Sequence, residues 1–197
     1  MKENINSQLE FLLEVDKMKT VLRRNLVSDG TRRENDAEHS WHFALAALIM
    51  AEHAHTDKID IARVIKMALV HDLVEVYAGD TFAYDKEGYE DKEKRELEAA
   101  DKLFSMLPEN QASEIRALWD EFEEIKTDES KYANSLDRFM PLLLNYNTEG
   151  HTWKLRDDIT SESVYKRMEP IKTGMPALWD TVCFMIEDSI NRGYLKR

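Results

Sequence analysis

The amino-acid sequence predicts an all-α protein, and three observations favour this class. Only six glycines and four prolines occur among 197 residues, so few positions interrupt a helix. Leucine, alanine, glutamate, lysine and methionine, which are all good helix formers, are abundant. Apolar residues recur at spacings of three and four, as they do along the buried face of a helix. We therefore expect a chain of about eight helices.

The predicted helices cover most of the chain, with boundaries placed to within several residues. We expect Asp36 to cap the second helix, and Asp57 or Asp60 the third, because aspartate accepts hydrogen bonds from first-turn amides. The segment 79–88 has glycine at both ends and no helical period, so it is the clearest predicted loop. The expected helices lie near residues 5–25, 37–55, 59–77, 89–107, 109–126, 129–147, 161–172 and 175–192.

Length and composition favour one compact domain over residues 1–197. Its functional core is expected at about residues 20–145, with C-terminal helices at about 160–193 packed on it. The longest apolar run, residues 43–51, is far shorter than the ~20 residues that cross a bilayer. A single cysteine permits no internal disulfide, and the first residues lack the apolar core of a secretory signal. A cytoplasmic location is therefore expected.

The charge balance points to a small anionic partner. With 27 basic and 39 acidic residues, the net charge of −12 disfavours a protein that coats nucleic acid. The segment 17–33 is the exception, because it holds six basic residues and one acidic residue. An anionic substrate would be attracted to this segment.

Two histidines and two aspartates, which are residue types that bind metal ions, lie in segments that are predicted to be helical. The adjacent pair His71-Asp72 lies in an almost wholly apolar helix, and Asp137 precedes a run of apolar residues. Buried carboxylates are costly unless a positive charge compensates them. Imidazole and carboxylate together suit Co, Mn, Ni, Fe or Zn better than Mg. With His39, these residues predict a site for one divalent metal ion.

The order of these residues resembles the signature of the HD-domain phosphohydrolases. More narrowly, Ala37-Glu38-His39-Ser40, His71-Asp72-Leu73-Val74-Glu75 and Gly79-Asp80 resemble the small deoxynucleoside monophosphate phosphatases of that superfamily, the 5′-deoxynucleotidases. The resemblance spans about residues 5–150 and implies an HD-domain helical fold and a homodimer. It also implies that one metal ion is held by His39, His71, Asp72 and Asp137.

Two carboxylates are candidates for proton transfer. On one continuous helix, Glu75 lies three residues after Asp72 and four after His71, so all three side chains can point toward one site. The resemblance places Glu75 beside the metal-activated water, which it would deprotonate or orient. Asp80 is a second candidate, either protonating the leaving ribose oxygen or positioning Glu75.

Two further residues are expected to bind substrate. In the resembling family an arginine four residues after a lysine contacts the substrate phosphate, and Arg23 stands in this relation to Lys19. Relatives have a tryptophan next, where this chain has Arg24, so a strict preference for a 2′-deoxy sugar does not carry over. His151 follows a helix stop and is expected either to line the substrate pocket or to cap that helix.

We therefore predict a metal-dependent hydrolase that releases phosphate from (deoxy)nucleoside 5′-monophosphates by attack of a metal-activated water. A hydrolase of another nucleotide phosphate, such as an alarmone, is the main alternative. A nucleotide-sensing module without catalysis is disfavoured, because a pure binder does not need Glu75 and Asp80. Residues 175–190 carry more apolar side chains than one packing partner covers, which also favours a homodimer.

Overall fold

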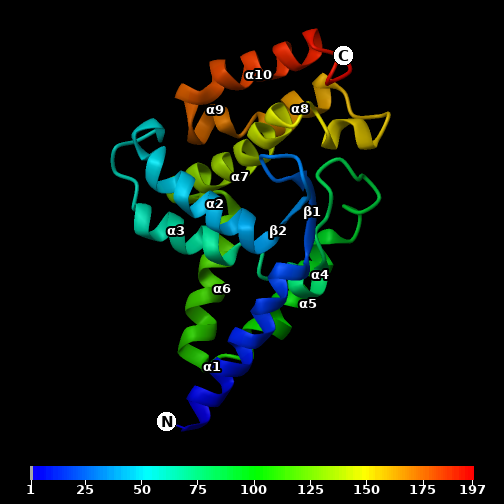
Figure 1. Ribbon diagram of the computed structural model, residues 1–197. Helices are drawn as coiled ribbons and strands as arrows, with labels where there is room; N and C mark the ends of the chain where they lie inside the picture. Colours follow the sequence, from blue (N-terminus) through cyan, green and yellow to red (C-terminus); the bar gives the residue numbers. More distant parts are fainter. Residues whose placement is uncertain (1) are drawn as a thin grey trace.

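The structure is a computed structural model that describes residues 2–197. In this part of the chain, eight helices have eight or more residues, as the sequence predicted, and two more are single turns, α4 (Glu75–Ala78) and α9 (Ile171–Gly174). Short 3₁₀ segments and one β-hairpin connect them (Figure 1). The longer helices are α1 (Lys2–Val15), α2 (Asp36–Ile49), α3 (Ile61–Val70), α5 (Lys92–Phe104), α6 (Glu109–Glu124), α7 (Asp128–Asn147), α8 (Ser161–Met168) and α10 (Trp179–Asn191).

Helix α7 forms the centre of the larger of two hydrophobic cores. It contacts α2, α3, α6, α8, α9 and α10. Tyr132 and Leu136 of α7 are fully buried together with Phe43 of α2 and Met67 of α3. The Tyr132 hydroxyl donates to the carbonyl of Ala47 at 3.0 Å, which satisfies the polar group in this apolar setting. Burial of each large side chain stabilises the fold by about 1.5–3 kcal/mol.

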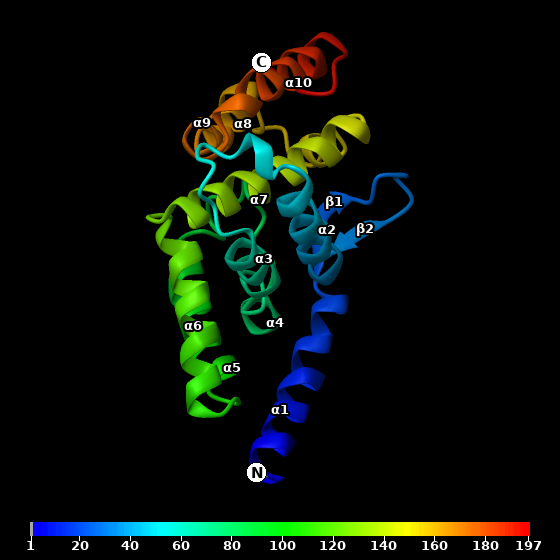
Figure 2. The same ribbon diagram turned by 90° about the vertical axis from the view of Figure 1, so that its left-hand side faces the viewer.

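The second core joins α5 and α6 to the inner face of α1, through residues such as Leu103, Trp119 and Phe11. Figure 2 shows α1 projecting at one end of the molecule, with α8, α9 and α10 at the other. Among the described residues, none of the helices is both long enough and apolar enough to cross a membrane.

The predicted helix at 5–25 is wrong in its second half. Helix α1 ends at Val15, a 3₁₀ segment follows (Asp16–Thr20), and β1 (Leu22–Leu26) pairs antiparallel with β2 (Arg33–Asn35). The Arg33 guanidinium donates to the carbonyls of Leu22 and Arg23 and so braces the hairpin. The inward residues of β1 are Arg23 and Asn25, so its alternation is not one of apolar and polar residues. A search for apolar periodicity therefore does not detect this strand.

The predicted helix at 59–77 is interrupted. Helix α3 ends at Val70, residues 71–74 form a turn, and α4 starts at Glu75. Within the turn, the Glu75 amide donates to the Asp72 carbonyl at 2.9 Å, a tighter spacing than in an α-helix. His71, Asp72 and Glu75 therefore do not lie on one continuous helix, and the prediction that they do is wrong.

Two N-cap predictions have different outcomes. Asp60 caps α3, since its side chain accepts from the Arg63 amide at 3.1 Å. Asp36 does not cap α2: Asn35 does, in a reciprocal capping box with Glu38. Asp36 is instead the first residue of α2, and its side chain is fully buried.

Candidate metal centre

Three segments that are distant in sequence bring the four predicted ligands together. Helix α2 supplies His39, the turn after α3 supplies His71 and Asp72, and α7 supplies Asp137. His39 Nε2 lies 3.0 Å from Asp137 Oδ1 and 3.9 Å from Asp72 Oδ2. His71 Nε2 lies 3.1 Å from Asp72 Oδ2 and 3.6 Å from Asp137 Oδ1. His39, His71 and Asp72 thus place their donor atoms within 4.8 Å of one another, and Asp137 adjoins this group through both histidines.

Hydrogen bonding orients the His71 ring for ligation. Its Nδ1 lies 3.0 Å from the Ala68 carbonyl oxygen, which can only accept, so this nitrogen carries the proton. In the neutral ring, Nε2 is left with its lone pair toward the carboxylates. This nitrogen is buried and has no hydrogen-bond partner among the described residues. A metal-binding histidine usually donates its other ring N–H to a fixed acceptor, and the Ala68 carbonyl is this acceptor for His71.

The two histidines respond differently to their surroundings. Burial and the nearby Arg23 charge lower the pKa of His39 to about 4, so its ring is neutral, as a ligand must be. Burial also acts to lower the pKa of His71, but Asp72 and Asp137 raise it to about 10. A proton on His71 therefore compensates the carboxylates where no metal ion does. A divalent cation would supply the same compensation, and the donor set fits one.

Strand β1 directs the Arg23 guanidinium into this group. One of its nitrogens donates to Asp72 Oδ2 at 2.7 Å and lies 3.5 Å from Asp36 Oδ1. Its Nε is buried and has no hydrogen-bond partner in the described structure. A guanidinium presents five N–H donors in a planar fork. Arg23 therefore keeps donors available for a phosphate oxygen next to the predicted metal ligands.

A group of three carboxylates lies next to the histidine and aspartate donors. Asp36, Glu75 and Asp80 each offer an oxygen within 4.8 Å of the others, and this group could also hold a cation. Burial, followed by the charges of Asp72 and Asp36, raises the pKa of Glu75 well above its usual value. Burial and Asp72 likewise raise the pKa of Asp36 to about 7, and burial raises that of Asp80. Carboxyl groups with raised pKa values in a buried site are typical of residues that transfer protons.

Sequence reasoning missed Asp36 and Glu34 as residues of the site. Glu34, on β2, is buried with one oxygen 3.9 Å from both His39 Nδ1 and Arg23 Nε. The signal for Asp36 was present, because a residue three positions before His39 shares its helix face. Its assignment as an N-cap concealed that signal.

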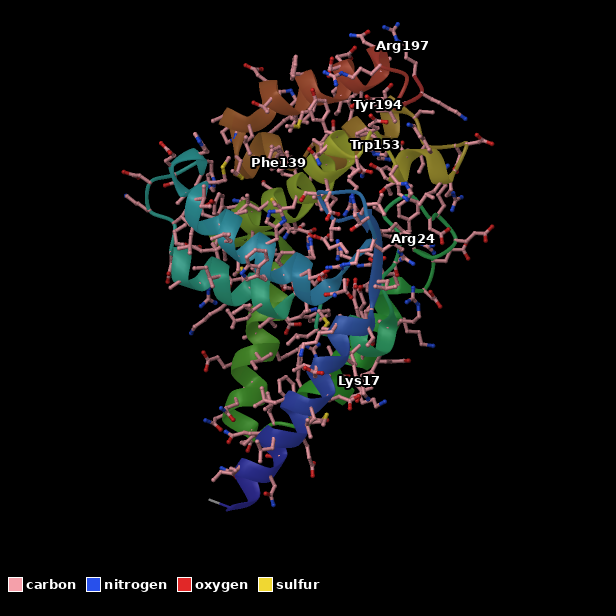
Figure 3. The ribbon with its side chains drawn as sticks, in the orientation of Figure 1. Lys17, Arg24, Phe139, Trp153, Tyr194 and Arg197 are labelled. Carbon is pink, nitrogen blue, oxygen red and sulfur yellow. The ribbon has the colours of Figure 1, made fainter. Side chains whose placement is uncertain are left out.

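A small cavity of about 50 Å³ adjoins Arg23 and Asp80. Arg24 of β1 and Trp153 of the 3₁₀ segment Thr152–Leu155 also line it, and both are labelled in Figure 3. The predicted pocket residue His151 is not among its lining residues. The chain turns at Gly150, where φ is +71°, and the 3₁₀ segment then carries Thr152 and Trp153 inward instead.

An all-α fold that gathers two histidines and two aspartates defines a helical protein with a candidate metal centre. The profile of the HD domain family matches residues 15–179, so the chain belongs to this family. A solved structure from Magnetospirillum magnetotacticum MS-1, described as a predicted metal-dependent phosphohydrolase, has a TM-score of 0.93 and 44% identity. That match covers 99% of this chain and 97% of the other.

Relatives with assigned names are more distant. The human protein named 5′-deoxynucleotidase HDDC2 is 32% identical over 133 residues, which cover 67% of this chain and 63% of the human protein. A protein of the same name from Dictyostelium discoideum is 30% identical over 166 residues, covering 82% of this chain and 87% of that relative. This chain thus spans less than two thirds of the human relative's length.

Proposed function

We propose that the protein hydrolyses the phosphomonoester of (deoxy)nucleoside 5′-monophosphates with the help of a divalent metal ion. The observation that carries this proposal is the placement of Arg23, whose guanidinium reaches Asp72 at 2.7 Å beside the gathered His and Asp donors. A phosphate bound there would lie between a cation site and the Glu75 carboxyl group. The names of the relatives, at about 30% identity, support a nucleotide as the substrate.

His39, His71, Asp72 and Asp137 would hold the ion. When bound, a divalent ion lowers the pKa of water and neutralises phosphate oxygens. The two imidazoles favour Co, Mn, Ni, Fe or Zn over Mg. We propose one such ion as the cofactor.

Glu75 and Asp80 would move the protons of the reaction. Burial is the largest cause of the raised Glu75 pKa, and the negative charge of Asp72 is the next. Neutralising Asp72 would lower the Glu75 pKa, which favours the carboxylate form that accepts a proton from the attacking water. Burial raises the pKa of Asp80, which favours Asp80 as the proton donor to the leaving ribose oxygen.

The proposal is tested by assaying the purified protein with ribo- and deoxyribonucleoside 5′-monophosphates in the presence of Mn, Co, Ni, Zn or Mg. We expect release of phosphate with at least one of the first four ions. Nucleotide binding without turnover under all these conditions would instead identify a sensing module. Because Arg24 replaces the expected tryptophan, we expect ribonucleotides to be hydrolysed as well as deoxyribonucleotides.

Replacing Arg23 by alanine is expected to raise KM for the nucleotide by about 10- to 100-fold, the usual effect of losing a charge-assisted hydrogen bond. The metal content should be retained, because the ion itself compensates Asp72. Arg32→Ala is a matched control on the same hairpin, since Arg32 pairs with Glu38 at the surface at 2.7 Å. Steady-state kinetics and metal analysis of both variants would check this. An unchanged KM in Arg23→Ala would remove the phosphate role.

We also propose a homodimer, but not through the C-terminal helix. Most apolar residues of 175–190 are covered within the chain, and Phe184 is the large apolar side chain of this segment that is clearly exposed. Elsewhere, exposed apolar residues concentrate on α1 and α2, a pattern typical of an interface. These exposed apolar residues are Ile5, Leu9, Leu12 and Leu13 on α1, and Trp41, Leu45, Leu48 and Ile49 on α2. Light scattering that shows a monomer at tens of micromolar would contradict the proposed homodimer.

The single cysteine, Cys183, is compatible with a reducing compartment, and we propose a cytoplasmic location.

A further inference from the structure

The structure holds a second, larger cavity of about 730 Å³. It is bounded by the loop after α4, by α7 and by α8. Arg138, which directly follows Asp137 on α7, lines it. Tyr84 and Arg167 line both this cavity and the small one next to Arg23, so the two cavities adjoin. The volume is within the range that accommodates a small-molecule ligand.

The two arginines of this cavity have no carboxylate partner. In the described part of the chain, neither Arg138 nor Arg167 forms an ion pair, and Arg138 Nε is buried without a hydrogen-bond partner. By contrast, Arg63, Arg116 and Arg192 each pair with a carboxylate at the surface. Holding two like charges together without an anion is unfavourable, so the arrangement points to a ligand that supplies one.

The rest of the lining is also biased toward positive charge. Four cationic side chains line the cavity, against three carboxylates. Two of these carboxylates, Asp85 and Asp158, are each 3.1 Å from the guanidinium of Arg156, which offsets one of their two negative charges. This local excess occurs in a chain whose net charge is −12. The cationic residues are Lys86, Arg138, Lys166 and Arg167.

We propose that Arg138 and Arg167 bind a second phosphate group of the substrate, on the far side of the sugar from the phosphate that is hydrolysed. The preferred substrate is then a nucleoside 3′,5′-bisphosphate. This inference rests on the proposed 5′-nucleotidase activity. Adjacent phosphates of a 5′-diphosphate share one bridging oxygen and would both lie against Arg23 and the metal ligands. A separate cavity suits a phosphate that is separated from the first by the sugar.

The test uses the full chain loaded with Mn²⁺. We expect kcat/KM for a deoxynucleoside 3′,5′-bisphosphate to exceed that for the 5′-monophosphate by about 10- to 100-fold, as for one or two charge-assisted hydrogen bonds. Arg138→Met and Arg167→Met should each reduce this ratio by about tenfold or more. Arg192→Met, which removes an equal charge just after the end of α10, should leave it unchanged. Arg167 lies on a different helix from Asp137, so its variant remains informative if Arg138→Met fails to fold.

Two controls separate this inference from the proposed function. The 5′-diphosphate has as many phosphates as the bisphosphate, and an equal preference for it would overturn the placement across the sugar. Calorimetric titration with the 5′-monophosphate and with the 3′,5′-bisphosphate measures binding separately from turnover. If neither nucleotide is hydrolysed, the proposed function fails. A bisphosphate preference in binding that Arg138→Met abolishes would still support the subsite.

Two outcomes would overturn the inference itself. One is hydrolysis of the monophosphate with no advantage for the bisphosphate in either assay. The other is binding of inorganic phosphate that requires Arg138 and changes turnover without competing with the nucleotide. That result would assign the subsite to a separate effector.

Discussion

Replacing His39 by alanine is expected to abolish metal binding and, with it, phosphate release. The His39 ring is almost fully buried, and its Nε2 lies 3.0 Å from Asp137. Its removal takes away one of four ligands and leaves the Asp137 carboxylate without its nearest partner. Leaving a buried acceptor without its hydrogen-bond partner costs about 1–3 kcal/mol. Metal analysis, an activity assay and thermal unfolding would measure the three effects.

His42→Ala is the matched control for this prediction. His42 lies three residues further along α2, where its ring stacks on Trp41 at 6.0 Å between centroids, and it is not a member of the His39–His71–Asp72 donor group. Its variant should keep both metal and activity. Asp72→Ala should behave like His39→Ala, because Asp72 offers a carboxylate oxygen to both histidines. Full metal occupancy in both His39→Ala and Asp72→Ala would refute the ligand assignment.

Glu75→Gln is expected to separate catalysis from metal binding. Glutamine has nearly the same shape but cannot accept the proton of the attacking water, so kcat should fall by about 10²–10⁴, with little change in KM. The metal content should stay at the wild-type level, because Glu75 is outside the His39–His71–Asp72 donor group. Glu98→Gln, at an exposed position of α5, controls for the lost charge.

Wild-type turnover in Glu75→Gln would transfer the role of the base to another carboxyl. Asp80 and Asp36 are then the candidates, since each places an oxygen within 4.8 Å of Glu75 and of the other. Asp80→Asn and Asp36→Asn would distinguish them. The residue whose amide variant lowers kcat while retaining metal would be the base.

The helical class of the fold was predictable because helix formers and the apolar period act locally. The same locality explains the failures. Arg23 and Asn25 occupy the inward positions of β1 because they serve buried polar partners, and a strand of this kind has no apolar signature. The break after Val70 is likewise invisible in a sequence whose apolar residues continue through Leu73 and Val74.

The candidate ligands were predictable for a different reason. A histidine or aspartate in an apolar segment needs a partner, and that demand can be read from the sequence without knowing the fold. Asp36 and Glu34 did not stand out, because carboxylates near a helix start are usually exposed caps. Their burial arises only when the hairpin and α2 pack together, which is a tertiary effect. The unpaired Arg138 could not be foreseen either, since the absence of a partner is a property of the whole fold.

The wide separation of the candidate ligands along the chain would link the binding of an ion to folding. His39 and Asp137 are 98 residues apart, and the turn after α3 lies between them. The unfolded chain cannot hold these groups in place, so an ion binds the folded state almost exclusively. Each tenfold rise of the free ion above its dissociation constant then stabilises the protein by about 1.4 kcal/mol. Metal supply in the cell would thereby set the protein's lifetime against proteolysis as well as its activity.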